Sequence, residues 1–163
     1  MKRFIFFLLV TLIISVNAKA SEISIVDVSY LLTNSNKGKL IKKDLDSLKS
    51  KNVKNFNSRK KKLEDKEKKI ASKKNVLSEE DFKKEVELFK KEVNKFNEDR
   101  RKSNQEMSLK RNNKIAKLLK EINKILIEYS AQNSISTIVD KKNVIITKEE
   151  NDITKNILKI LNK

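Results

Sequence analysis

The sequence predicts an α+β protein: a small body with β-strands, built from the two ends of the chain, carries one long antiparallel α-helical hairpin. Short β-branched runs lie near both ends of the 163-residue chain. The middle of the chain has apolar residues at helical spacing and contains no proline. Near its midpoint, signals that end one helix and begin another stand side by side.

The first segment, residues 1–20, has the three parts of a secretory signal peptide. Lys2 and Arg3 precede the apolar run "FIFFLLVTLII", and Ala18-Lys19-Ala20 forms an A-x-A cleavage site. The alternative, an uncleaved membrane anchor, needs about 20 apolar residues, and this run is shorter. We therefore predict cleavage after Ala20, which removes three basic residues and no acid and lowers the formal net charge from +17 to about +14.

Residues 21–40 are predicted to form the N-terminal part of the body. The run "EISIVDV", residues 22–28, is β-branched and is typical of a short buried strand. The spacing then becomes helical from Ser29. The segment "TNSNKGK", residues 33–39, interrupts that spacing and predicts a loop centred on Gly38, the only glycine of the chain.

Residues 41–129 are predicted to form the hairpin, with a turn near residues 75–81. Ser78 is a favourable N-cap, and the acidic residues 79–81 after it complement a helix dipole, whereas Lys73 and Lys74 suit the last turn of a preceding helix. The alternative, one continuous helix, would place the two ends of the chain more than about 100 Å apart. The predicted helices span about residues 39–75 and 79–131.

The apolar stripe along these two helices is thin and uneven. In the first helix one apolar residue recurs every seven positions, while the intervening positions, such as Arg59 and Lys66, are polar, so that the helix carries only half of a coiled-coil seam. In the second helix the apolar residues follow one another in alternating steps of four and three positions, and the apolar stripe thins over residues 100–113. The stripe members are Phe56, Leu63, Ile70 and Leu77, and then Phe82, Val86, Phe89, Val93 and Phe96.

Residues 130–163 are predicted to complete the body. "STIVD", residues 136–140, and "VIIT", residues 144–147, are two strand candidates joined by a hairpin-length connection. The terminal segment "NDITKNILKILNK" predicts a helix with Asn151 or Asp152 as its N-cap. So few strands bury little apolar surface, and we expect the body to be stabilised by oligomerisation.

The composition excludes several functions. Without cysteine or histidine the chain has no disulfide, no His- or Cys-ligated zinc site and no His-dependent triad. No pair of carboxylates stands out from the alternating surface charge, so we predict a protein that is not an enzyme and needs no cofactor. Its basic charge predicts acidic partners, and export would separate it from nucleic acid.

In order and spacing, five segments resemble the Skp (OmpH-like) family of periplasmic chaperones: "ISIVDV", "LSEEDFKKE", "FNEDRRKSNQE", "STIVDKKNVI" and "NDITKNILKILNK". The resemblance implies a homotrimer with a central β-body, from which three helical hairpins project around a cavity. It further implies an ATP-independent holdase in the periplasm, which holds unfolded outer-membrane β-barrel proteins in that cavity. The alternative function is that of a structural coiled-coil protein of the envelope, acting as a spacer or tether.

Two sets of candidate site residues follow. The aromatic residues Phe56, Phe82, Phe89 and Phe96 are the candidates for client contact, with the alternative that they only join the two helices. The cluster Arg100, Arg101 and Lys102 is the nearest match to basic residues that the resemblance links to lipopolysaccharide or anionic lipid. Its alternative is a solvated helix face, with Glu98 paired to Lys102.

Overall fold

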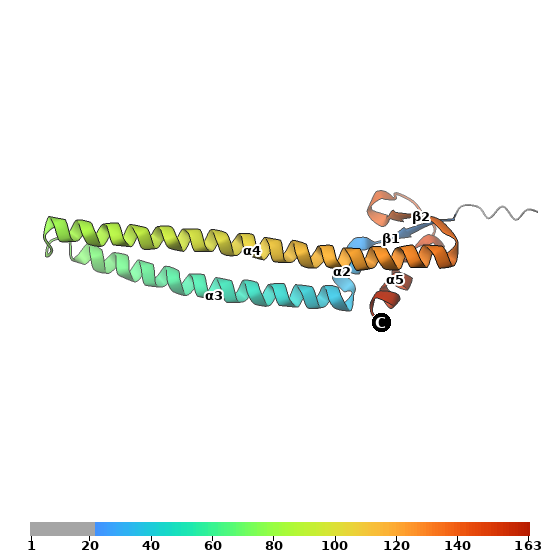
Figure 1. Cartoon of the computed structure of the whole chain (residues 1–163), viewed down its shortest axis with the longest axis horizontal. Coiled ribbons are helices and arrows are strands. Elements are labelled where there is room, and N and C mark those ends of the chain that lie inside the picture. Colours follow the sequence, from blue (N-terminus) through green and yellow to red (C-terminus); the bar gives the residue numbers. More distant parts are fainter. Residues whose placement is uncertain (1–21) are drawn as a thin grey trace, which may run out of the picture.

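The fold was analysed in a computed structural model, which describes residues 22–163; the predicted signal peptide lies outside these residues. A long hairpin of two helices projects from a small body at one end (Figure 1). Two short 3-10 helices, η1 (Lys141–Asn143) and η2 (Glu149–Asn151), lie between the last strand and the last helix. The other elements are β1 (Glu22–Val26), α2 (Val28–Asn34), α3 (Asn36–Ser72), α4 (Glu79–Asn133), β2 (Ile135–Asp140) and α5 (Thr154–Leu161).

The two strands are parallel, so the entire hairpin serves as the crossover between them. A parallel partner must start at the same end of the sheet as β1. Helix α4 makes this possible because it has 55 residues against 37 in α3. The difference adds about 27 Å, which carries the chain past the body before β2 turns back beside β1 (Figure 1).

The other edge of β1 is occupied by the segment that leads into α5. The Ile153 amide donates to the Ile25 carbonyl at 3.0 Å, and Ile25 and Asp152 form an isolated parallel bridge. The Asp27 amide donates to the Thr154 hydroxyl at 2.8 Å. These contacts join the two motifs at opposite ends of the chain, "VDV" and "DIT".

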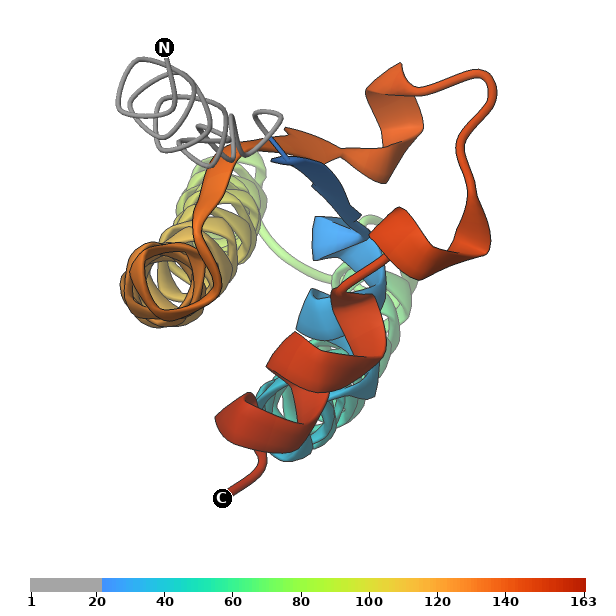
Figure 2. The same cartoon turned by 90° about the vertical axis from the view of Figure 1, so that its right-hand side faces the viewer.

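The core of the body lies between the sheet and three helices. Viewed from its end, the body has α4 on one side, α5 on the other and α2 between them, beneath the sheet (Figure 2). The buried apolar residues from these elements form one cluster: Val26, Leu31, Leu118, Ile122, Ile153, Ile157 and Leu161. The hairpin helices are therefore anchored in the body through the base of α4.

The predicted strand over residues 144–147 is not formed. Residues 141–143 make a 3-10 turn instead of a hairpin connection, and the side chains of Ile145 and Ile146 are 99% and 89% exposed. The prediction paired this run with residues 136–140, but β2 pairs only with β1 among residues 22–163. The 3-10 turn takes the place of the hairpin connection that would lay residues 144–147 back against β2.

The predicted loop over residues 33–39 is also wrong. Helix α2 ends at Asn34 and α3 begins at Asn36, so Ser35 alone breaks the helix, and its hydroxyl accepts from the amide of Gly38 at 3.1 Å. Gly38 is helical and buried. A Cβ there would lie 1.9 Å from the Leu32 carbonyl oxygen, so glycine allows the start of α3 to pack against α2.

The predicted cap of the last helix differs by one position. Ile153 occupies the N-cap position of α5 and contributes no side-chain hydrogen bond. Asp152 acts from one residue earlier, where its Oδ1 accepts from the Thr154 amide at 2.9 Å. At the tip of the hairpin, by contrast, Ser78 caps α4 as predicted and accepts from the Asp81 amide at 3.1 Å.

Candidate functional site: the two flanks of the hairpin

The centre of the hairpin is joined by an aromatic pair. The rings of Phe56 on α3 and Phe96 on α4 meet edge to face with 5.9 Å between their centroids. The guanidinium of Arg59 lies over both rings, at 5.6 and 5.5 Å. It also forms an ion pair with Asp99 at 2.8 Å. This cluster combines apolar burial, cation–π attraction and an ion pair at one level of the hairpin.

One side of the α3–α4 contact is closed by polar contacts between the helices, which we call the ladder flank. Most of its members are ion pairs with the base on α3 and the acid on α4; the pair of Asp44 with Lys114 has the opposite orientation. From the body outwards, the contacts are Lys37–Glu121, Asp44–Lys114 at 2.6 Å, Asn52–Ser103 at 2.8 Å, Arg59–Asp99 at 2.8 Å, Lys66–Glu92 at 2.6 Å and Lys73–Glu85 at 2.7 Å.

The ladder follows a seven-residue step on both helices, with one exception. From Asp44 to Arg59 the step is fifteen residues instead of fourteen, and the same holds from Asp99 to Lys114 on α4. A strict seven-residue repeat corresponds to about 3.5 residues per turn, so its positions drift slowly around a straight α-helix. One extra residue corrects this drift and restores an average of about 3.6 residues per turn. The interruption falls where the apolar stripe thins.

The other side, which we call the open flank, carries a groove between α3 and α4. It consists of two adjoining cavities of about 510 and 450 Å³, which share Lys49 and Met107. Lys42 on the groove side and Asp44 on the ladder side are two residues apart, which turns a helix by about 200°. The two sides meet at Asn52, which belongs to the ladder and also lines the groove. Its apolar lining comes from Leu32, Ile41, Leu45, Val53, Phe56, Phe96, Met107, Ile115 and Leu118.

The rim of this groove is basic. On α3, Lys42, Lys49 and Lys60 lie seven and eleven residues apart and therefore on one face; on α4, Arg100 and Arg111 do the same. Asp46 is the one carboxylate that residues 22–163 contribute to the lining. Within residues 22–163 only one rim residue has an ion pair, the contact of Lys60 with Glu64 of its own helix at 3.4 Å.

The structure separates the predicted aromatic residues into two groups. Phe56 and Phe96 pack against each other and also line the groove, Phe96 being buried with 8% of its surface exposed. Phe82 and Phe89 lie nearer the tip of the hairpin and are half-buried. Two of the four predicted residues are therefore brought together, and the other two lie apart from the groove.

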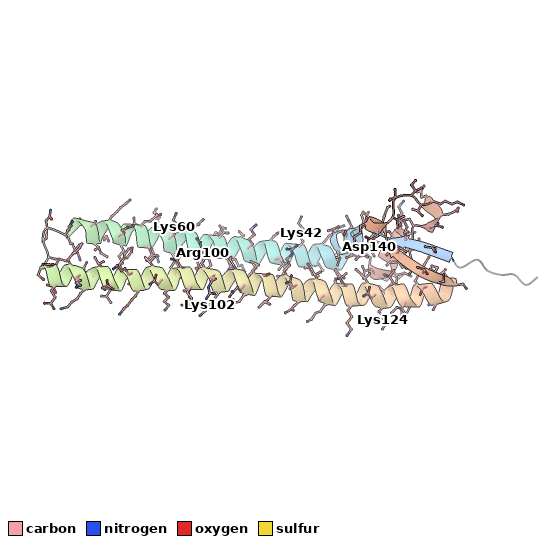
Figure 3. All side chains as sticks on the ribbon, turned by 90° about the horizontal axis from the view of Figure 1, so that it is seen from above. Lys42, Lys60, Arg100, Lys102, Lys124 and Asp140 are labelled. Atoms are coloured by element: carbon pink, nitrogen blue, oxygen red, sulfur yellow. The ribbon has the colours of Figure 1, made fainter. Side chains whose placement is uncertain are left out.

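Two members of the predicted basic cluster, Arg100 and Arg101, line one shallow hollow on α4, and Lys102 does not line it. Successive residues of a helix are about 100° apart, so Arg100 and Lys102 lie on different sides of α4. Arg100 lies between the helices and Lys102 on the outer side of α4 (Figure 3). Lys102 forms an ion pair with Glu98 at 2.8 Å; the hydrogen bond between them raises the pKa of Lys102 and lowers that of Glu98.

Neither the cross-helix role of the polar stripe positions nor the grouping of the rim lysines was predicted from the sequence. A signal for the first was present: Arg59, Lys66 and Lys73 recur every seven residues, and so do the acids Glu85, Glu92 and Asp99. The rim lysines carry a weaker signal, because many lysines of this chain share their spacing. Only the pairing of the helices distinguishes the two flanks.

An ion pair within the C-terminal segment lies beside the contact between Asp152 and β1. Asp152 accepts from the ammonium of Lys141 at 2.7 Å. Burial raises the pKa of Asp152, but the hydrogen bonds from Lys141 and Thr154 outweigh it, and the pKa is lowered overall. The same hydrogen bond raises the pKa of Lys141. The ionised carboxylate thus stabilises the start of α5 beside β1.

Neither a metal site nor a membrane span is found in the described part of the chain. Among residues 22–163, no group of three or more acidic, cysteine or histidine side chains is placed to hold a metal ion. No helix in the same range is both long and apolar enough to cross a membrane.

A two-stranded body with a crossover made of one long helical hairpin defines a narrow class of fold. The family of OmpH-like outer membrane proteins matches residues 22–161, and the chain belongs to this family. The match confirms the resemblance found in the sequence. The family is not enzymatic, in agreement with the prediction that this chain is not an enzyme.

A solved structure shares the fold over most of its length. It is a crystal structure of a protein assigned as an OmpH-like outer membrane chaperone from Caulobacter crescentus CB15. The TM-score is 0.81 at 14% sequence identity, over 88% of this chain and 85% of that one. No curated protein sequence matches the chain.

Proposed function

We propose that this protein is an ATP-independent holdase of the periplasm, which binds unfolded outer-membrane β-barrel proteins and prevents their aggregation. Family membership supports a chaperone role in general. The observation that carries the proposal is the open flank, where an apolar groove with a basic rim is exposed on a hairpin that its ladder holds closed. Such a surface binds apolar segments reversibly, and holding an unfolded chain needs no chemical step.

We further propose that the working form is a homotrimer with its cavity between three hairpins. The body of a single chain exposes large apolar residues: Ile23, Ile127, Ile145, Ile146 and Ile160. Among residues 22–163, the β-branched run at residues 144–147 also has no partner strand. Association would cover these residues and give that run a strand of another chain to pair with. An isolated two-stranded sheet is only marginally stable, so additional strands would stabilise the body.

The test of the holdase is suppression of aggregation. An outer-membrane barrel protein unfolded in urea is diluted into buffer at low salt, with or without the mature protein, and light scattering is followed. We expect suppression at near-stoichiometric trimer, whereas unchanged scattering refutes the holdase. The rival function, a spacer or tether, predicts no affinity for unfolded chains.

The assembly is tested separately by light scattering coupled to size exclusion and by small-angle X-ray scattering. A trimer with splayed hairpins gives three times the chain mass and a hollow profile. A monomer at working concentration would refute the cavity. A compact rod would favour the spacer.

A further inference from the structure

We propose that the open flank is the client-binding site, and that it selects extended segments in which apolar and acidic residues alternate. This proposal rests on the proposed function, to which it adds a position and a preferred chemistry. Its first support is the asymmetry of the hairpin, since the ladder flank is occupied by ion pairs between the helices whereas the open flank is not.

The charge of the rim determines the chemistry of the occupant. Lys42, Lys49, Arg100 and Arg111 have no ion-pair partner among residues 22–163. Lysine and arginine side chains lie along apolar surface while their charged ends stay in water. A bound segment with its apolar face on the floor and its carboxylates on the outer face would bring those carboxylates to these charged ends, and a segment with basic residues there would be repelled.

The dimensions of the groove suit an extended chain. From Lys42 to Lys60 the rim follows α3 over about 27 Å at the rise of a helix. An extended chain of about eight residues covers that length. Side chains of a strand alternate between two faces, so such a segment can place its apolar side chains on the floor, formed by residues such as Val53 and Met107. Transmembrane strands of β-barrels alternate apolar and polar side chains in this way.

The experiment compares two triple variants of the full mature chain that carry the same charge. The groove variant is Lys42→Glu, Lys49→Glu and Lys60→Glu. The control variant is Lys43→Glu, Lys54→Glu and Lys61→Glu, whose lysines are exposed on α3 outside the groove. Because both variants change the net charge equally, the overall field of the protein is matched between them.

The probe is a fluorescein-labelled peptide of about ten residues that alternates Leu or Val with Glu or Asp, and its binding is measured by anisotropy at low salt. We expect the groove variant to weaken binding about tenfold or more and the control to weaken it less than about threefold. A matching peptide with Lys in place of the acids should bind weakly to all three proteins. Equal loss in both variants, or loss in neither, overturns the proposal.

Circular dichroism and the thermal midpoint establish that both variants fold. A second measurement needs no charge reversal: a benzoylphenylalanine photocrosslinker replaces Val53, which faces the groove, or its neighbour Lys54, which does not. Crosslinking of the acidic peptide from position 53 and not from 54 supports the proposal. Equal crosslinking from both positions contradicts it.

The two proposals fail in different ways. If the wild-type protein does not suppress aggregation, the holdase itself is refuted. If wild type and both variants suppress aggregation equally, the holdase stands and the groove is not its site. Phosphatidylglycerol vesicles are tested in parallel; if only vesicle binding depends on the rim lysines, the groove binds lipid and the proposal is wrong.

Discussion

The aromatic pair in the hairpin gives the sharpest prediction about stability, which the substitution Phe96→Ala tests. Phe96 is 8% exposed, and its ring centroid lies 5.9 Å from that of Phe56. The guanidinium carbon of Arg59 lies 5.5 Å from the Phe96 ring centroid. Phenylalanine to alanine costs about 3–5 kcal/mol in a core. The hairpin is only two helices thick, and the remaining side chains can partly fill the space. We therefore expect about 3 kcal/mol, the low end of that range.

The measurement is native-state hydrogen exchange. A loss of about 3 kcal/mol in local opening accelerates the amides of α4 around Phe96 about 100-fold. Amides near Ile122 should keep their protection, because they lie in the core of the body. The matched control is Leu109→Ala on the same helix, whose side chain is 62% exposed. It should change exchange less than about threefold.

Two results would refute this reasoning. If Phe96→Ala leaves the exchange of α4 within about threefold of wild type, the aromatic pair does not join the helices. If the body amides accelerate as much as those of the hairpin, the two parts unfold together and the local assignment is wrong.

Three further substitutions test other contacts. Gly38→Ala should lower the free energy of unfolding by about 1–3 kcal/mol, because a Cβ would lie 1.9 Å from the Leu32 carbonyl oxygen. An unchanged unfolding midpoint would contradict that close approach. Asp152→Asn should cost about 1–2 kcal/mol at neutral pH in urea titrations. The pKa of Asp152 in the folded protein is lowered from 3.8. The stability that its carboxylate contributes is therefore complete above pH 3.8 and is lost as the pH falls through the pKa of the folded state. A stability difference between wild type and Asp152→Asn that persists at acid pH would refute this. Lys66→Glu and Glu92→Lys should each destabilise the hairpin, and their combination should recover about 0.5 kcal/mol in a double-mutant cycle at low salt.

The turn of the hairpin could be predicted from the sequence because its determinants are local. Ser78 and the acidic residues after it specify a helix start within four residues, and the structure has α4 beginning at Glu79. Dipole and capping effects act within one turn of a helix. The end of α3 was less well placed, since Ser72 precedes the predicted residue 75, and helix C-termini without glycine carry a weaker signal.

The body was harder to predict because its strands are defined by partners distant in sequence. The run at residues 144–147 has the same β-branched composition as β1, yet only β1 has neighbours on both edges. Gly38 illustrates the same limit. A glycine signals either a loop or a close approach of two backbones, and only the packing of α2 on α3 distinguishes them.

Client contact and helix pairing were given as alternatives for the aromatic residues, and both could hold only if the pairing of the two helices opens. The geometry removes that conflict for one pair. Phe56 and Phe96 join the helices and also line the groove of the open flank. Since the ladder closes only the opposite side of the contact, the hairpin can stay paired and still present apolar surface. The register of α3 against α4 decides which side is which, and that register is a property of the pair that neither helix carries alone.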